Sequence, residues 1–454
     1  MDSFLLNAIA FVLALGVLIT VHEFGHFWVA RRLGVKVLRF SVGFGRPLWR
    51  HVGRADGTEY VVAALPLGGY VRMLDEREGE VAPHEAHRAF NRQSLRTRSA
   101  IVAAGPLFNF AFAILAYWLV FVSGDVGTRP LIGSVTAGSP AAAAGFRPGD
   151  LVQRVNGEAT PTWETVVYAL LAAGVGEVPA RIEVQAPDGA AELRVLSTGS
   201  LLELNEQRDA LGSLGLAPER PVLEAVIGEV IPGEAADRAG LRVGDRLIAV
   251  DGEPIRDWAA WVDFVQGRPG KTLRLDLERD GLAMATEIVP AAVERGGTLV
   301  GRIGAAVRLD PNLMDRYRAE VRYGPVEALG VAVHKTWELS ALTLRVVWKM
   351  LIGEASVNNL SGPISIAQSA GQSASIGFVQ FLKFLALVSV SLGVLNLLPV
   401  PVLDGGHLAY FAVEAIKGGP LSEATQALGQ RIGLALLIGL MALVLYLDLV
   451  RLLA

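Results

Sequence analysis

The stretch Val21-His22-Glu23-Phe24-Gly25-His26-Phe27 directly follows an apolar run that begins at Phe4. Residues four apart on a helix lie one above the other on the same face, so His22 and His26 can hold one metal ion together. Glu23 lies beside them, close to water bound on that ion. Ionisable side chains are costly in a membrane helix, so the cluster predicts a functional site rather than the packing of two histidines in an ordinary helix interface.

The H-E-x-x-H pattern is typical of zinc proteases, in which two imidazoles bind Zn²⁺ and the glutamate is the general base. A second polar cluster runs from Asn396 to His407, and two prolines in it break any helix. Backbone freed in this way needs protein or a water-lined cavity around it at membrane depth. Asp404 in this cluster would complete a His-His-carboxylate set with a fourth position open for water. His407 is a rival ligand, which we expect outside the set.

The composition points to a membrane protein. The chain has 454 residues, of which 52% are hydrophobic, and its mean hydropathy is +0.42, which predicts several membrane spans. Nothing in the formal charge of -4 suggests a nucleic-acid partner. Cysteine is absent, so thiolate ligands and disulfides are excluded. Apolar stretches of spanning length cover residues 4–27, 100–122, 377–402 and 432–450.

The first apolar run has no basic region before it and no small-residue cleavage site, so we interpret it as a retained span and not a signal peptide. Residues 31–98 carry 13 Arg or Lys against 7 Asp or Glu. The positive-inside rule therefore places this segment in the cytoplasm. Residues 123–377 are then extracytoplasmic.

Residues 58–73 are rich in β-branched and aromatic side chains and are broken by Pro66 and Gly68-Gly69, which predicts a hairpin. Two interpretations stay open. The hairpin can be a small cytoplasmic β-layer. Alternatively, it reaches the metal and offers a strand edge that holds a substrate peptide extended.

An internal repeat lies between the second and third spans. Ala144-Gly145-Phe146-Arg147-Pro148-Gly149-Asp150 recurs as Ala239-Gly240-Leu241-Arg242-Val243-Gly244-Asp245, and Trp163 recurs as Trp258, at a constant offset of 95 residues. The pattern resembles the PDZ domain, which binds extended peptides at a sheet edge. A pair of spacers that bind nothing is the alternative.

These pieces together resemble the site-2 proteases, the intramembrane zinc metalloproteases. The resemblance covers essentially the whole chain and is carried by His22 to His26, Gly43-Phe44-Gly45, Pro66 to Val71, Gly105-Pro106 with Asn109, the tandem repeat, Asn359 to Ile364, and Asn396 to Gly406. From the residues alone, we expect Asn109 to bond to a neighbouring helix as structural glue.

The resemblance implies a role for each matching residue. The zinc ligands would be His22, His26 and Asp404, with Glu23 as general base and Asn396 on the substrate backbone. The edge strand that pairs with unwound substrate would comprise Gly68, Gly69, Tyr70, Val71, Arg72 and Met73. Members of the family cut single-span membrane proteins, among them an anti-sigma factor already trimmed by another protease, in an envelope stress response, and they clear remnant signal peptides. The location implied is the bacterial inner membrane, in contact with lipid.

The expected fold is a membrane α-helical protein with four transmembrane helices, a membrane-associated β-hairpin region and two tandem extracytoplasmic PDZ domains (α+β). Its expected parts are a first span with H-E-x-x-H (1–30), a cytoplasmic segment with the hairpin (31–98), a second span (99–122), two PDZ domains (129–215 and 222–307), interfacial amphipathic helices (320–372), a third transmembrane segment (376–406) and a fourth span (431–451). Two rivals to a protease are a non-catalytic scaffold that presents PDZ modules and a metal transporter. The four spans show no paired halves of the kind that transporters have.

Overall fold

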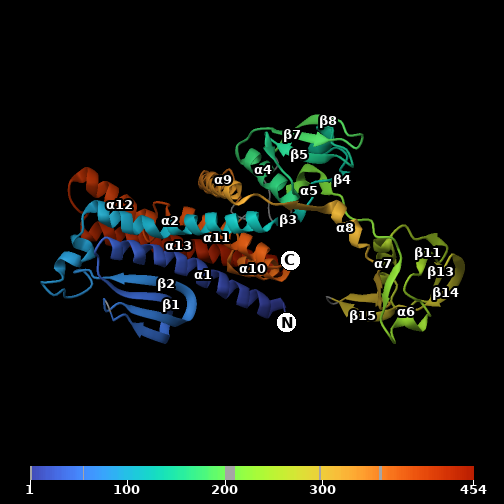
Figure 1. The fold of residues 1–454 in the computed structure, drawn as a ribbon, viewed down its shortest axis with the longest axis horizontal. Helices are drawn as coiled ribbons and strands as arrows, with labels where there is room; N and C mark the ends of the chain where they lie inside the picture. Colours follow the sequence, from blue (N-terminus) through green and yellow to red (C-terminus); the bar gives the residue numbers. More distant parts are fainter. Residues whose placement is uncertain (1–2, 55, 200–209, 296–297, 357–359, 454) are drawn as a thin grey trace.

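The computed structural model describes residues 3–54, 56–199, 210–295, 298–356 and 360–453 (Figure 1). Among them, four helices are long and apolar enough to cross a membrane, as predicted: α1 (Ser3–Arg32), α2 (Leu95–Ser123), α11 (Phe378–Asn396) and α13 (Glu423–Leu453). The second begins before the expected residue 99 because the Ser94 hydroxyl accepts a hydrogen bond from the Thr97 N–H at 3.2 Å and caps the helix.

The third predicted segment, residues 376–406, is not one continuous element. Helix α11 ends at Asn396, residues 397–403 form a turn that contains both prolines, and a new helix, α12 (Asp404–Lys417), begins at the predicted ligand. The turn folds tightly onto the start of α12. A Cβ atom on Gly405 or Gly406 would collide with backbone oxygens of this turn, so the two glycines allow Asp404 to lie beside the end of α11.

The hairpin prediction needs correction. Strand β2 (Glu59–Met73) does not fold back on itself; it pairs antiparallel with β1 (Val37–Val52), and both strands bend together. As a result, β1 residues 37–42 lie between two arms of β2, residues 59–62 and residues 69–73. Arg39, for example, is opposite both Glu59 and Arg72. Gly43 lies at the bend with φ +92, a backbone conformation that disfavours side chains. The second arm, residues 69–73, is an outer arm with no further strand beside it in the described part of the chain.

The two repeats have the same layout. Each has a four-stranded sheet, β6-β5-β7-β8 in the first and β12-β11-β13-β14 in the second, and a separate strand pair, β4-β9 or β10-β17. Both sheets turn at equivalent positive-φ residues 95 apart, Asn156 and Asp251. The first repeat closes with β9, three residues beyond the expected boundary at 215, and residues 200–209 lie outside the described part.

The elements of the first repeat are β4 (Ile132–Val135), α3 (Pro140–Ala143), β5 (Leu151–Val155), β6 (Glu158–Ala159), α4 (Trp163–Val175), β7 (Ala180–Gln185), β8 (Ala191–Leu196), α5 (Ala210–Leu214) and β9 (Leu216–Pro218). Those of the second are β10 (Ile227–Val230), α6 (Ala235–Arg238), β11 (Arg246–Val250), β12 (Glu253–Pro254), α7 (Trp258–Gln266), β13 (Leu273–Arg279), β14 (Leu282–Ile288), β15 (Ala291–Arg295), β16 (Thr298–Arg302) and β17 (Ala305–Val307).

A two-stranded stem joins the repeats to the helical bundle. It pairs β3 (Asp125–Thr128), which follows α2, with β18 (Arg318–Val321), which follows α8 (Pro311–Tyr317). The ammonium of Lys383 on α11 lies 2.9 Å from Asp125 in the stem and 2.6 Å from Glu164 in the first repeat, which fixes both to the bundle. Figure 1 shows the repeats at the end of the bundle where the two chain termini lie, and β1 and β2 toward the other end.

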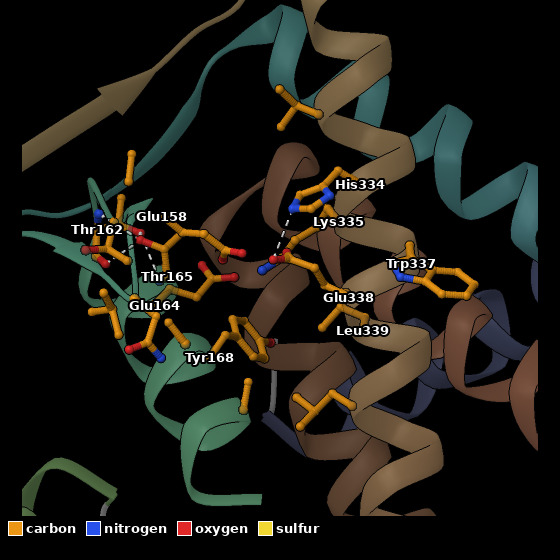
Figure 2. Close-up of a pocket in the computed structure, with 18 of the residues that line it drawn as sticks. Glu158, Thr162, Glu164, Thr165, Tyr168, His334, Lys335, Trp337, Glu338 and Leu339 are labelled. Carbon is orange, nitrogen blue, oxygen red and sulfur yellow. Dashed lines mark hydrogen bonds and ion pairs between the residues drawn. The ribbon is translucent and has the colours of Figure 1, made fainter. Parts of the chain in front are cut away.

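The predicted interfacial segment, residues 320–372, divides into two helices with different surroundings. Helix α9 (Pro325–Leu351) is not among the four apolar spans, and it exposes Val326, Trp337 and Trp348. Helix α10 (Pro363–Ile376) packs along α1, where a Cβ on Gly371 would strike Asn7. Small residues allow this close contact. A cavity of about 690 Å³ separates α9 from α4 of the first repeat (Figure 2).

Candidate metal centre

Helices α1 and α12 bring the three predicted ligands together. The Oδ2 atom of Asp404 lies 3.1 Å from His22 Nε2 and 3.4 Å from His26 Nε2, and the two Nε2 atoms are 3.3 Å apart. Their side chains are only 14%, 11% and 18% exposed for His22, His26 and Asp404. The helical spacing of the histidines and the glycine-rich start of α12 therefore produce one compact donor set.

This donor set fits zinc. Tetrahedral zinc with bonds of about 2.0–2.1 Å to nitrogen and oxygen separates its ligand atoms by about 3.3–3.4 Å, close to the three separations observed. The Asp404 Oδ2 atom is buried and has no hydrogen bond. A buried acceptor without a donor is costly, and a cation between the three atoms removes that cost.

Helix α2 supports the imidazoles from behind. The Nδ1 atom of His26 lies 2.8 Å from the carbonyl oxygen of Ile101, which leaves Nε2 free for a metal. A Cβ atom at Gly105 would lie 2.8 Å from His22 Cε1 and closer still to His26 Nε2, so only glycine leaves room for both rings. Asn109 is fully buried, and its amide nitrogen lies 3.2 Å from His22 Nδ1. The sequence did not predict that Ile101 and Gly105 support the imidazoles. Ile101 acts through its backbone carbonyl, and Gly105 acts by having no side chain.

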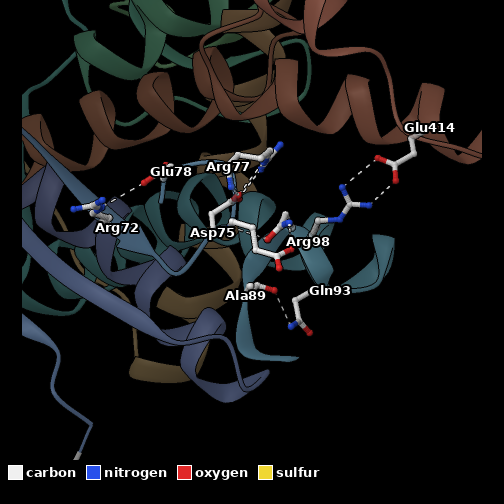
Figure 3. Close-up of polar contacts among 10 residues, drawn as sticks. Arg72, Asp75, Arg77, Glu78, Ala89, Gln93, Arg98 and Glu414 are labelled. Carbon is white, nitrogen blue, oxygen red and sulfur yellow. Dashed lines mark hydrogen bonds and ion pairs between the residues drawn. The ribbon is translucent and has the colours of Figure 1, made fainter. Parts of the chain in front are cut away.

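An ion pair fixes α12 to α2. Arg98 contacts both carboxylate oxygens of Glu414, at 3.2 and 2.5 Å (Figure 3). The Arg98 guanidinium also lies 4.9 Å from the centre of the Phe411 ring. The side chains of Arg98 and Glu414 are 14% and 17% exposed. Because bidentate arginine pairs have a fixed geometry, this contact sets where α12, and with it Asp404, lies relative to α2.

Glu23 faces the outer arm of β2. Its side chain lies close to Gly69 of this arm. A Cβ on Gly69 would lie 3.2 Å from Glu23 Cγ and 2.8 Å from the carbonyl oxygen of Ser41. Gly69 thus allows the arm, its β1 partner and α1 to approach closely.

The other predicted residues have varied surroundings. Asn396 is the last residue of α11 and half-buried. The Tyr70 hydroxyl accepts a hydrogen bond from Arg39 at 3.0 Å, and Arg72 pairs instead with Glu78 at 3.3 Å in an exposed position. His407 is not part of the ligand group. Asn359, one of the residues that carry the resemblance, lies outside the described residues.

Comparisons with known proteins agree with this geometry. The family model Peptidase family M50 matches residues 10–440. The Regulator of sigma-E protease RseP of Escherichia coli (strain K12) is 47% identical over 458 residues, with 100% of both chains covered. The Regulator of sigma E protease of Haemophilus influenzae is 42% identical, with 99% of this chain and 100% of the relative covered.

A relative from Vibrio cholerae, named as a zinc metalloprotease, is 44% identical with 100% of both chains covered. A solved PDZ domain of the SdrC-like protein from Listeria monocytogenes matches 19% of this chain and 88% of its own at 18% identity, but its TM-score of 0.17 is too low to assign a fold. The family model and the full-length relatives favour the protease over the scaffold and the transporter. The chain therefore belongs to peptidase family M50, the site-2 proteases, and is a zinc metalloprotease.

Proposed function

We propose that this protease hydrolyses peptide bonds within the membrane, in the transmembrane segments of single-span proteins. The observation that carries the proposal is the position of the donor set. His22 and His26 belong to one apolar spanning helix, and the glycine of another spanning helix, Gly105, lies directly behind them. A metal site built from spanning helices acts on substrates that are themselves in the bilayer.

In the proposed mechanism, His22, His26 and Asp404 hold the metal and Glu23 moves the proton. Zinc bound there would act as a Lewis acid, which polarises the scissile carbonyl and lowers the pKa of water toward about 7. The Glu23 carboxylate takes the proton of the attacking water and passes it to the leaving amine nitrogen. The Glu23 side chain lies close to Gly69, on the side of the donor set where the outer arm lies.

Substrate binding would use the outer arm of β2 as a template. A helical peptide bond is shielded by its own turn, so the substrate segment must unwind before hydrolysis. The free edge of Gly69–Met73 can pair with the unwound segment through main-chain hydrogen bonds, and Gly69 of this arm lies close to Glu23. Asn396, at the end of α11 and eight residues before Asp404, would hold the substrate backbone from the other side.

The relatives' names and the charge pattern support a proposal for the substrates and the orientation. The proposed substrates are an anti-sigma factor trimmed by a first protease, which fits relatives named as regulators of sigma E, and remnant signal peptides, which are single apolar segments. The 13 basic residues between 31 and 98 would place β1 and β2 on the cytoplasmic side of the bacterial inner membrane and the two repeats, as PDZ domains, outside. There the repeats would exclude substrates that still carry a bulky domain.

The test is cleavage of a single-span reporter by the purified protein in detergent, with zinc content measured on the same samples. We expect Glu23→Gln to keep one zinc per chain and to lose at least about 100-fold in rate, because a general base contributes on the order of 10²–10⁴-fold. His22→Ala should lose both zinc and activity. Cleavage by Glu23→Gln at the wild-type rate would show that another group is the base.

The filtering role has its own test. Removal of residues 129–307 should increase cleavage of an untrimmed substrate while leaving the trimmed one unchanged. Equal effects on the two substrates would exclude a filter.

A further inference from the structure

Helix α2 presents three consecutive turns to the donor set. Ile101, Gly105 and Asn109 are spaced by four residues, so they lie on one face of the helix. The first accepts from His26, the second makes space for both rings, and the third touches His22. The role of Asn109 is the one that the proposed mechanism has not used.

The neighbouring imidazole shows what the site requires. For a neutral histidine to bind a metal through Nε2, the proton must be on Nδ1 and must be donated to an acceptor. His26 meets this requirement with the Ile101 carbonyl at 2.8 Å. His22 directs its Nε2 into the same donor set, so its Nδ1–H needs an acceptor as well. The side chain within reach of this Nδ1 is Asn109.

The amide of Asn109 can supply that acceptor. Its oxygen is buried and has no hydrogen-bond partner, while its nitrogen lies 3.2 Å from His22 Nδ1. A half-turn about the Cβ–Cγ bond exchanges the two atoms with little change in shape. We propose that Asn109 accepts a hydrogen bond from the Nδ1–H of His22, and so fixes the tautomer and orientation in which His22 binds zinc. The inference rests on the proposed role of His22 as a ligand.

The surroundings of Asn109 make it a rigid support. Asn109 is 0% exposed, and its backbone carbonyl oxygen accepts a hydrogen bond from the Ser389 hydroxyl of α11 at 2.8 Å. The next residue, Phe110, packs against Gly393 of α11. A residue held on both helices cannot follow His22 if the ring turns, so Asn109 acts as a positioning residue for the ligand.

The experiment measures the zinc dissociation constant of the full-length protein in detergent by competition with a chelator. Asn109→Leu keeps the volume and removes the acceptor, whereas Asn109→Asp keeps an acceptor. We expect the leucine variant to bind zinc about 10- to 100-fold more weakly and the aspartate variant to stay within a few-fold of wild type. Ser389→Ala, which removes only the bond to the Asn109 backbone, is the matched control and should bind like wild type.

A further readout separates positioning from packing. The melting temperature of the metal-free protein should be the same with and without Asn109→Leu. If the leucine variant does not fold, Asn109→Ala replaces it. The proposal is wrong if Asn109→Leu binds zinc like wild type, or if the aspartate variant binds zinc as weakly as the leucine variant. It is also wrong if Asn109→Leu lowers the melting temperature of the metal-free protein. A wild type without stoichiometric zinc would instead overturn the proposed function itself.

Discussion

Two groups of three side chains in the described residues bring histidine and carboxylate donors close enough to share a cation: His22, His26 and Asp404 in the bundle, and Glu158, His334 and Glu338 between the first repeat and α9. Both place two donors one turn apart on a helix and take the third from another element. In the second group, His334 Nε2 lies 3.2 Å from Glu338 Oε1, and Glu158 faces them from β6 (Figure 2).

The surroundings differ more than the donors do. The bundle group is at most 18% exposed and has a backbone carbonyl, a glycine and a buried amide behind its rings. The side chains of His334 and Glu338 are 63% and 32% exposed, so water competes with a cation for them. The comparison teaches that donor type and spacing are not enough for a metal site, which also needs support that fixes the rings.

The largest expected effect comes from filling the space behind the rings. Gly105→Ala places a methyl group against both imidazoles, so we expect zinc affinity to fall by about 100-fold or more, with matching loss of reporter cleavage. Gly16→Ala on α1 is the control, because a Cβ there meets nothing within 4 Å. Retention of full zinc content by Gly105→Ala would mean that the rings can shift freely.

A smaller effect is expected from loosening α12. Arg98→Met removes the bidentate contact with Glu414, and α12 then holds Asp404 less firmly, so zinc affinity should fall by about 10-fold. Arg72→Met breaks an arginine–glutamate pair that is 49% and 60% exposed, and it should leave affinity unchanged. Both pairs are drawn in Figure 3. An equal response of the two variants would argue against a specific role for Arg98.

The group of Glu158, His334 and Glu338, the exposed group, should make a small contribution to stability that depends on pH. Burial and the neighbouring Glu338 carboxyl raise the pKa of Glu158 above its ordinary value of 4.5. A carboxyl group whose pKa is raised by folding stabilises the folded state fully at pH values below its ordinary pKa. This stabilisation is lost as the pH rises through the pKa of the folded state. Glu158→Gln should therefore be slightly more stable than wild type at pH 7, by about 0.5 kcal/mol after solvent screening, and equal to it near pH 4. Thermal unfolding at the two pH values measures this, and a larger gain at pH 4 would contradict it.

The smallest effect is expected from the histidine of the exposed group. His334→Ala should leave the protein with one tightly bound zinc and an unchanged cleavage rate, because its partners are solvated and lack fixed support. Elemental analysis after dialysis measures the zinc. A drop from two zinc ions to one would show that the exposed group is a metal site as well.

The sequence by itself determined the features that depend on spacing. The four-residue interval of His22 and His26 fixes their common helical face, the apolar runs fix four spanning helices, and the constant offset of 95 fixes a repeated layout. Each is local or periodic, so helix and strand geometry alone carries it from sequence to structure.

Tertiary structure decided the rest, because it depends on what lies next to what. The bend at Gly43 and the pairing of both β2 arms with β1 replaced the expected hairpin and left Gly69–Met73 as an outer edge. Tertiary contacts also place α10 along the side of α1. At the metal centre, the Ile101 carbonyl looks like any other backbone group in the sequence, and only the crossing of α1 and α2 makes it the acceptor that orients His26.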